Sequence, residues 1–98
     1  MNLQLEERHW KIIQQILSKY PHKFYAYGSR VKGTARKYSD LDICYREEVP
    51  LTIISQIREQ FMESNLPFEV ELVNWKHMRP KFQELIKSDL TLLTKTLK

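Results

Sequence analysis

Two short segments alternate apolar and acidic residues, and this alternation constrains the fold more than any other feature of the sequence. Asp40 and Asp42 alternate with leucine and isoleucine, and Glu69 and Glu71 alternate with phenylalanine, valine and leucine. Successive side chains of a β-strand point to opposite faces of the sheet. Each segment therefore predicts a strand that buries one face in a hydrophobic core and carries two carboxylates on the other face.

Helical and extended segments alternate along the rest of the chain. The predicted elements are helices over residues 3–20, 50–64 and from about residue 80, and strands over residues 23–27, 41–45 and 68–73. The last helix is expected to bury Phe82, Leu85 and Ile86, and residues 89–98 are left unassigned. This order predicts one domain over residues 1–98 with an α/β (α+β) fold, in which helices pack on a small sheet.

The two glycines of the chain, Gly28 and Gly33, lie within six consecutive residues, directly after the first predicted strand. The polar segment that follows predicts a loop with room for one helical turn. A glycine after a strand permits a sharp turn and lets a phosphate approach main-chain N–H groups. Between Glu7 and Asp40 there are eight lysines and arginines and no acidic residue, and the net charge is +4. This stretch predicts a surface for phosphate, a nucleotide or nucleic acid, although a solvated basic face would have the same composition.

Several classes of protein are not expected. No apolar run approaches the roughly 20 residues that span a bilayer, and the first residues lack the basic leader and apolar core of a secretory signal. A single cysteine, Cys44, cannot form an internal disulfide, which fits a reducing compartment. The three histidines show no zinc-ligand spacing. We therefore expect a cytoplasmic protein without a membrane partner.

The spacing of the glycines and carboxylates resembles a known enzyme signature. Gly28 and Ser29 are followed, after ten residues, by Asp40, a leucine, Asp42 and an apolar residue. This arrangement resembles the polymerase-β-like nucleotidyltransferase superfamily, and Gly33 and the serine before Asp40 are similar to its subgroup of minimal nucleotidyltransferases. The helix after the second strand, the Leu-Pro break and the Val-Glu-Leu-Val-Asn-Trp strand are similar to that subgroup too. The resemblance covers nearly the whole chain and implies a small mixed sheet packed with helices.

The resemblance also implies a nucleotide site at the first glycine. Gly28 and Ser29 would hold the triphosphate of the nucleotide, which the resemblance implies is ATP. Arg30, Lys32 and Lys37 follow this motif and can supply positive charge to a polyphosphate, and we expect Arg30 and Lys37 to contact phosphates. A helical turn that starts at Ser29 would add free N–H donors to the site.

Three carboxylates are implied as the catalytic and metal-binding set. Asp40 and Asp42 would bind two Mg²⁺ ions, and Glu71 falls on the position of a third carboxylate that helps to deprotonate the acceptor hydroxyl. Glu69 is the alternative for that third position. The family residue there is normally aspartate, so Glu71 departs from the pattern by one methylene. Misplacing a catalytic group by about 1 Å can lower a rate by roughly 10²-fold.

The implied reaction is metal-dependent transfer of a nucleoside monophosphate, AMP from ATP, to a hydroxyl acceptor. In the subgroup, the acceptor lies on a separate all-helical HEPN toxin, which the nucleotidyltransferase inactivates as its antitoxin, so we expect such a partner. A second copy of this chain is the other means of completing the cleft. Two alternatives stay open. In the first, Glu71 disables catalysis, and the protein is an antitoxin or scaffold that binds a nucleotide and acts by binding its partner. In the second, which we favour less, the basic stretch belongs to a nucleic-acid-binding module and the two aspartates are incidental.

Overall fold

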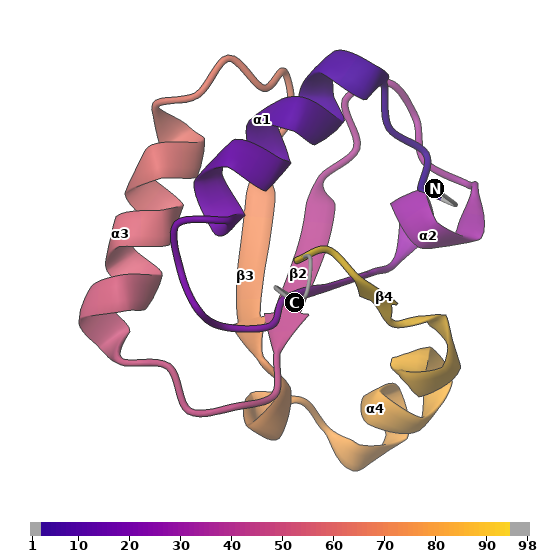
Figure 1. Cartoon of the computed structure of the whole chain (residues 1–98). Coiled ribbons are helices and arrows are strands. Elements are labelled where there is room, and N and C mark those ends of the chain that lie inside the picture. Colours follow the sequence, from indigo (N-terminus) through magenta and orange to yellow (C-terminus); the bar gives the residue numbers. More distant parts are fainter. Residues whose placement is uncertain (1–2, 95–98) are drawn as a thin grey trace.

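A four-stranded mixed sheet lies at the centre of the computed structural model, which describes residues 3–94 (Figure 1). The order across the sheet is β3-β2-β1-β4. β2 and β3 run parallel, whereas β1 is antiparallel to both β2 and β4. The strands are β1 (Tyr25–Tyr27), β2 (Leu41–Tyr45), β3 (Val70–Asn74) and β4 (Thr91–Leu92). The sequence prediction of a small mixed sheet packed with helices is confirmed.

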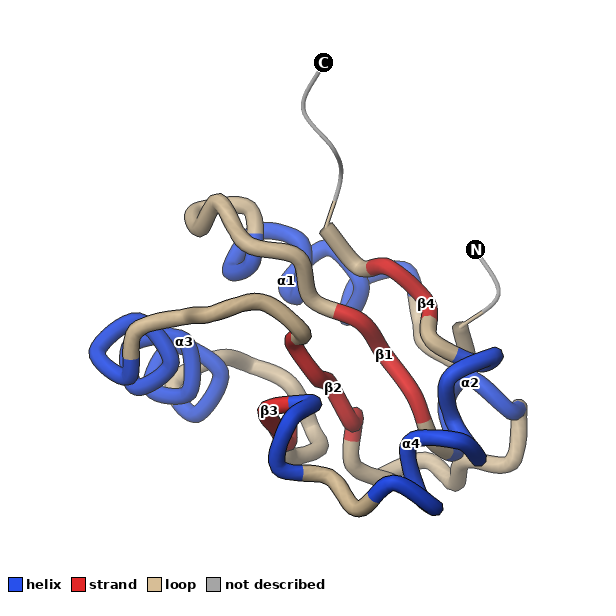
Figure 2. The backbone as a smooth tube through the Cα atoms, turned by 90° about the horizontal axis from the view of Figure 1, so that it is seen from below, coloured by secondary structure: helices blue, strands red, loops and turns tan. Residues whose placement is uncertain are grey.

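The helices cover the two faces of the sheet unequally. Their bounds are α1 (Glu7–Leu17), α2 (Ser29–Lys32), α3 (Leu51–Met62) and α4 (Pro80–Ile86), with short 3₁₀ turns η1 (Trp75–His77) and η2 (Lys87–Asp89). α1 and α3 lie on one face, and the short α4 lies on the opposite face (Figure 2). Within residues 3–94, no helix has both the length and the apolar character needed to cross a membrane.

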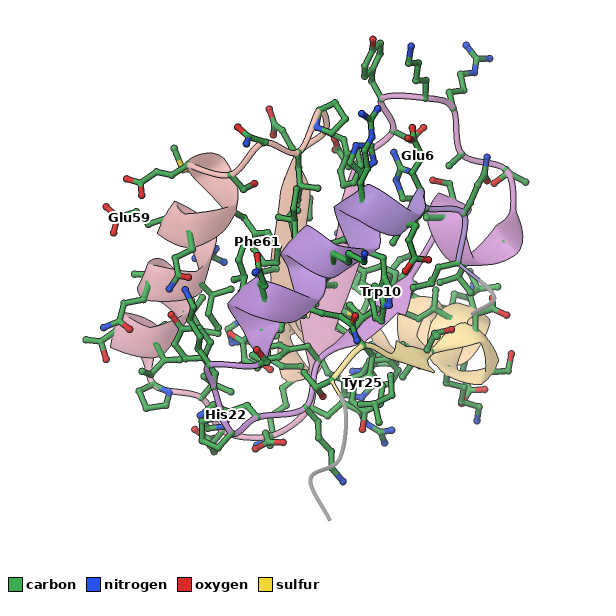
Figure 3. All side chains as sticks on the ribbon, turned by 45° about the horizontal axis from the view of Figure 1, so that its top comes forward. Glu6, Trp10, His22, Tyr25, Glu59 and Phe61 are labelled. Atoms are coloured by element: carbon green, nitrogen blue, oxygen red, sulfur yellow. The ribbon has the colours of Figure 1, made fainter. Side chains whose placement is uncertain are left out.

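The main hydrophobic core fills the space between the sheet and the helices α1 and α3. Leu41 and Ile43 on β2 are fully buried there, as their alternation with the aspartates predicts. Ile57 of α3 is fully buried against the same face. On α3, Phe61 lies between the helix and α1, whereas Glu59 points away from the molecule (Figure 3). The alternating pattern of the strand and the helical spacing of α3 therefore converge on one core.

The N-terminal segment differs from the prediction, because helix α1 begins at Glu7 and residues 3–6 are not helical. The main-chain N–H of Gln4 donates to the carbonyl of Arg30 over 2.8 Å. The side chain of Gln4 also forms two hydrogen bonds with the main chain of Ala35, one to its carbonyl at 2.7 Å and one from its N–H at 2.9 Å. These contacts hold the first described residues against the loop after α2, and helical geometry there would break them.

One prediction at the C-terminal end of the chain is corrected, and residues 89–94 of the unassigned tail are now placed, whereas residues 95–98 lie outside the described residues. Of the three side chains expected to be buried by the last helix, only Ile86 is buried, at 4 % exposure, while Phe82 and Leu85 are 41 % and 70 % exposed. The helix is only seven residues long and contacts the sheet mainly through Ile86 and through Phe82, whose ring meets that of Tyr27 edge-on at 5.9 Å. The unassigned tail contains β4, which pairs with β1.

Candidate active site

Asp42 and Glu71 are direct neighbours across the two parallel strands. The register pairs Asp42 of β2 with Glu71 of β3. On its other side, Asp42 is paired with Tyr27 of the antiparallel strand β1. Paired residues on adjacent strands point to the same face, so Tyr27, Asp42 and Glu71 form a row across the face that α4 partly covers. The strands thus bring together two of the three predicted catalytic carboxylates.

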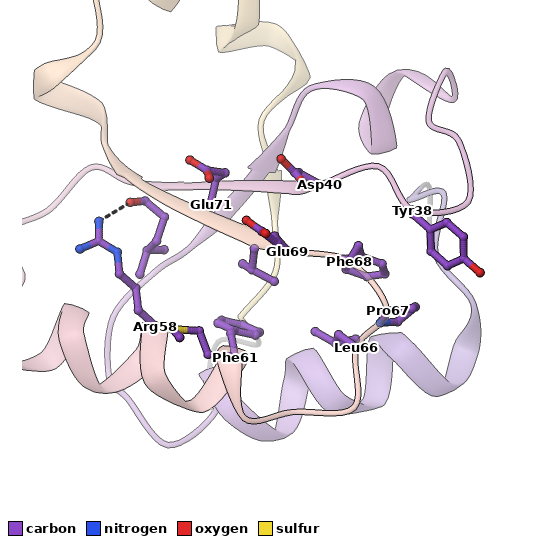
Figure 4. Close-up of a pocket in the computed structure, with 12 residues that line it drawn as sticks. Tyr38, Asp40, Arg58, Phe61, Leu66, Pro67, Phe68, Glu69 and Glu71 are labelled. Carbon is purple, nitrogen blue, oxygen red and sulfur yellow. Dashed lines mark hydrogen bonds between the residues drawn. The ribbon is translucent and has the colours of Figure 1, made fainter.

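Asp40 stands directly before β2, at the mouth of a pocket that runs along the edge strand β3. The main-chain N–H of the next residue, Leu41, donates to the carbonyl of Glu69 over 2.9 Å, which fixes this end of the strand pair. Asp40, Glu69 and Glu71 lie along one side of the pocket, and apolar side chains from α3 and from residues 66–68 lie along the other (Figure 4). This carboxylate pocket has a volume of about 780 Å³.

The charges on these carboxylates act on one another. Burial raises the pKa of Asp42 above its ordinary value, and the negative charges of Asp40 and Glu71 raise it further. The pKa of Tyr27 rises to about 12, first because the phenol is partly buried and then because Asp42, Cys44 and Glu71 repel the phenolate. Arg30 lies close enough to Asp40 for their charges to interact, but the repulsion that Asp40 and Glu71 exert on Asp42 shows a negative potential that favours a bound cation.

The donor chemistry of the cluster fits Mg²⁺. Carboxylate oxygens are ligands that Mg²⁺ prefers, usually one or two of them together with water and substrate phosphates. Within residues 3–94, no three Asp, Glu, His or Cys side chains are gathered closely enough to hold a metal ion by themselves. Asp40 and Glu71 are close enough to Asp42 to raise its pKa, but the three carboxylates are not close enough together to enclose a metal ion. A metal ion held by them would need further oxygen ligands, such as those of a polyphosphate.

Gly28 forms the turn between β1 and α2, and its lack of a side chain is required by Asp42. Its backbone has φ 85° and ψ −154°, a conformation that L-residues rarely adopt. A Cβ at this position would overlap Oδ2 of Asp42 and would lie 3.4 Å from the Cγ of that residue. Ser29 follows as the first residue of α2, where the main-chain N–H has no acceptor within the helix. The predicted glycine turn and the predicted carboxylate are thus in contact.

Gly33 has a different role, although it also has a positive φ of 77°. It ends α2 in the left-handed conformation that commonly closes a helix. A Cβ added to Gly33 would meet no atom within 4 Å. Glycine is therefore needed at position 33 only for the backbone conformation, whereas at position 28 it is also needed because a side chain would collide with Asp42.

Arg30 is placed differently from what a phosphate contact requires. The side chain is buried, at 5 % exposure, and its guanidinium lies 4.0 Å from the centre of the Phe68 ring. It donates to the main-chain carbonyls of Gln4, Lys37 and Ser39 over 2.8, 3.2 and 2.7 Å. Burial lowers the pKa of Arg30, and the charge of Asp40 partly offsets this effect. These contacts give Arg30 a structural role in holding the loop, and its contact with a nucleotide stays a prediction that they do not support.

Lys37 is exposed and lies at a second pocket, away from the row of carboxylates. Its Nζ is 5.4 Å from the centre of the Tyr38 ring. Lys37 lines the second pocket together with Arg8 and Arg36 and does not line the carboxylate pocket. Of the predicted nucleotide-binding residues, the structure therefore brings Gly28 and Ser29 to the carboxylates and leaves Lys37 apart.

Two contributors to the site were missed by sequence reasoning. Gln4 braces the loop between α2 and β2 through Ala35, and no local pattern in the sequence marks it. Arg58 of α3 donates to the carbonyl of Leu72 over 2.9 Å and so occupies a main-chain acceptor of β3 at the pocket (Figure 4). Both contacts join residues at least 14 positions apart, because Arg58 and Leu72 are separated by 14 and Gln4 and Ala35 by 31.

Most of the chain matches a known protein family. The family described as Polymerase beta, Nucleotidyltransferase matches residues 11–96 of the chain. The chain belongs to this family. The match includes all the residues of the candidate site, from the glycine turn to Glu71 on β3, while the bracing residue Gln4 lies before it.

Individual nucleotidyltransferases are also similar to the chain. The "Probable protein adenylyltransferase MntA" of Haemophilus influenzae is 42% identical over 78 residues, which cover 78% of this chain and 67% of that protein. A crystal structure of a candidate nucleotidyltransferase from Sulfolobus solfataricus has 20% sequence identity and a TM-score of 0.46, and the match covers 86% of this chain and 74% of that one. The sequence prediction of a minimal nucleotidyltransferase is therefore confirmed at the level of the family.

Proposed function

We propose that this nucleotidyltransferase is a protein adenylyltransferase, which transfers AMP from ATP to a hydroxyl group of a partner protein and releases pyrophosphate. The observation that carries the proposal is the pairing of Asp42 with Glu71 beside the glycine turn, with Asp40 directly before the strand that holds Asp42. The similarity to MntA, whose name assigns it protein adenylylation, supports a protein as the acceptor.

In this proposal the glycine turn binds the nucleotide and the three carboxylates bind the metal ion. The turn at Gly28 leaves main-chain N–H groups open to the triphosphate, and Ser29 begins α2 at that point. Asp40, Asp42 and Glu71 would hold Mg²⁺, which when bound neutralises the charge of the triphosphate and of the leaving group. The acceptor oxygen attacks the α-phosphorus of ATP, and the bond between the α-phosphorus and its bridging oxygen breaks to release pyrophosphate.

Glu71 is the proposed acceptor of the proton that the hydroxyl loses. It is exposed on β3 and lines the carboxylate pocket, so an acceptor side chain that enters this pocket reaches its carboxylate. Asp42 is less exposed than Glu71 and does not line the carboxylate pocket, so an incoming acceptor meets Glu71 first. The two carboxylates therefore have different roles, Asp42 toward the metal and nucleotide and Glu71 also toward the acceptor.

The proposed partner is a helical HEPN-type toxin, with a tyrosine hydroxyl as the acceptor and with this chain as the antitoxin. The carboxylate pocket is formed by one side of a sheet edge and is open, which suits an acceptor supplied by another chain, either this partner or a second copy. The partner class rests on the resemblance to minimal nucleotidyltransferases.

Incubation of the purified protein with Mg²⁺, α-labelled ATP and the proposed HEPN-type partner tests the proposal. We expect label on the partner and loss of labelling in Asp42→Asn. Glu69→Gln is the matched control, because Glu69 lines the same pocket and the charges that raise the pKa of Asp42 are those of Asp40 and Glu71. Absence of transfer in the wild type at any pH and metal tested would refute the enzyme.

A second candidate function is partner binding without catalysis. The observation that favours it is that glutamate stands at the third carboxylate position and that no three acidic side chains of residues 3–94 converge on one point. Tight partner binding without transfer, with transfer gained in Glu71→Asp, would support this alternative. RNA binding that weakens steeply with salt and is unaffected by Asp42→Asn would instead support the nucleic-acid-binding module.

A further inference from the structure

A second pocket on the molecule is strongly basic and has no part in the proposed reaction. It has a volume of about 540 Å³ and lies between the first described residues and the loop after α2. Four cationic side chains line it, Arg8, Arg30, Arg36 and Lys37, against one carboxylate, that of Glu6. Glu6 lies at the end of α1 that faces this loop (Figure 3). We call this feature the basic pocket.

The positive charge of the basic pocket is only partly compensated. Glu6 is paired with Arg8 over 3.0 Å and offsets one of the four positive charges, and the charge of Asp40 also acts on Arg30. Among residues 3–94, neither Arg36 nor Lys37 forms an ion pair, and the guanidinium of Arg30 is held by main-chain carbonyls, which leave its charge in place. A pocket with this charge attracts an anionic group.

The basic pocket adjoins the carboxylate pocket. Tyr38 and Pro67 line both of them, so these two side chains form the ridge between the pockets. Tyr38 is 63 % exposed and stands at the end of the carboxylate pocket beside Pro67 (Figure 4). An extended chain advances about 3.3 Å per residue, so a few residues of a bound segment cross the ridge from one pocket to the other.

We propose that the basic pocket binds an acidic segment of the protein acceptor, which lies a few residues from the hydroxyl that receives AMP. This inference rests on the proposed function, and it adds the charge pattern that the enzyme selects around the acceptor residue. One side of the ridge then supplies the reacting carboxylates, and the other side supplies the charges that hold the acceptor in register.

The charges around the ridge favour a peptide over a nucleic acid. A nucleic acid carries a phosphate at every nucleotide, and the carboxylates of Asp40, Glu69 and Glu71 on the far side of the ridge would repel that uniform charge. A peptide can place acidic residues over the basic pocket alone and neutral residues beside the carboxylates.

Acceptor kinetics test this inference with a charge-matched pair of variants. In Arg8→Glu/Arg36→Glu we expect the KM for the protein acceptor to rise roughly 10-fold at low salt and less at high salt, with kcat and the KM for ATP little changed. Lys11→Glu/Lys81→Glu is the control, because it makes the same change in net charge at exposed lysines that line none of these pockets. An unchanged acceptor KM in the first variant, or an equal rise in both, would overturn the proposal.

Direct binding tests the pocket without the reaction. We expect a fluorescein-labelled hexaglutamate peptide to bind the wild type at low ionic strength, to bind Arg8→Glu/Arg36→Glu several-fold more weakly, and to bind the control variant as it does the wild type. Tighter binding of hexauridylate that is lost in the same variant would overturn the peptide in favour of RNA. Peptide binding without transfer to any acceptor would support the pocket and refute the enzyme, whereas transfer with an unchanged acceptor KM would refute only the pocket.

Discussion

The two faces of the sheet are built from the same strands and differ in what they do. On the face covered by α1 and α3, Leu41 and Ile43 of β2 are fully buried among apolar side chains. On the opposite face, Asp42 of the same strand lies between Tyr27 and Glu71 and is only partly covered. One face therefore stabilises the fold, and the other places negative charges where they repel each other.

This difference shows how a chain of 98 residues supports a charged site. Removing a carboxylate from water and placing it beside two others is unfavourable. The apolar face offsets this loss, because burial of each large aliphatic side chain contributes about 1.5–3 kcal/mol. Binding of a cation and a polyphosphate would then relieve the repulsion at Asp42 and stabilise the folded protein.

Replacing Asp42 by asparagine is expected to have the largest effect on activity and the opposite effect on stability. Loss of this carboxylate should reduce AMP transfer by more than about 10²-fold, since even the loss of groups that only support metal ligands lowers metal affinity or activity 10- to 100-fold. The metal-free variant should melt at a higher temperature than the wild type. Transfer assays and thermal unfolding in a chelator measure the two effects.

The pH dependence of this stability difference separates charge repulsion from other causes. Because the pKa of Asp42 is raised in the folded protein, folding is favoured when the group is protonated, and that contribution is lost as the pH rises from 3.8 through the raised pKa. The stability gained by Asp42→Asn should therefore grow with pH over this range and level off at neutral pH. Mg²⁺ should stabilise the wild type more than the variant. A variant less stable than the wild type at pH 7 without metal would contradict this account.

Gly28→Ala is expected to have the next largest effect on activity, because the turn after β1 lies against Asp42. The added methyl group overlaps Oδ2 of Asp42, and the residue must also hold a positive φ. We expect transfer to fall roughly 10²-fold, as for a displacement of about 1 Å, and stability to fall by more than about 1 kcal/mol.

Gly33→Ala is the control for a positive φ without the overlap, and its left-handed conformation costs alanine less than the φ 85° and ψ −154° of Gly28. It should reduce stability by about 1 kcal/mol and leave kcat close to that of the wild type. Equal losses of activity in the two variants would mean that the steric contact between Gly28 and Asp42 is unimportant.

Most of the fold was predictable because its strands have a clear period of two. The bounds of β2 were predicted to the residue, since Leu41, Ile43 and their acidic neighbours alternate strictly. The start of α1 was placed too early, because the contacts of Gln4 with the distant Ala35 decide it. The strand β4 was not assigned, because its two residues become a strand only by pairing with β1.

The candidate site was predictable to the extent that it depends on the same alternation. Asp42 and Glu71 share a face because each occupies the alternate position on its own strand, and adjacency in the sheet then brings them together. Arg30 was expected at the phosphates from its proximity in sequence. Its observed position depends on the ring of Phe68 and on carbonyls from two separate segments, and no local pattern encodes these contacts.

Changes to the apolar face should affect stability and leave the chemistry intact. Ile57→Ala, on α3, removes a fully buried side chain and is expected to lower the free energy of unfolding by about 2–5 kcal/mol. At a temperature where the variant remains folded, its kcat should stay within about 2-fold of the wild type, because the residue lies across the sheet from Asp42. Ile57→Val, with an expected loss of about 0.5–1.5 kcal/mol, provides a graded control. Urea unfolding and transfer rates on the same samples would test both expectations, and a loss of kcat in folded Ile57→Ala would show that the two faces are coupled.

The smallest effect is expected at Cys44, which lies on the face of Asp42 but is fully buried beneath α4 with Tyr27 and Ile86. Burial raises the pKa of the Cys44 thiol to about 11, although the charge of Arg46 slightly opposes this rise. At pH 8 only about one thiol in a thousand would be ionised, and the thiolate is the reactive form. Iodoacetamide should therefore modify the native protein far more slowly than the urea-unfolded protein, and Cys44→Ala should keep transfer within about 2-fold. Rapid alkylation of the native thiol with loss of transfer would mean that the part of this face beneath α4 opens to solvent and takes part in the reaction. The boundary between structural and reactive residues would then lie within this face of the sheet, and not between its two faces.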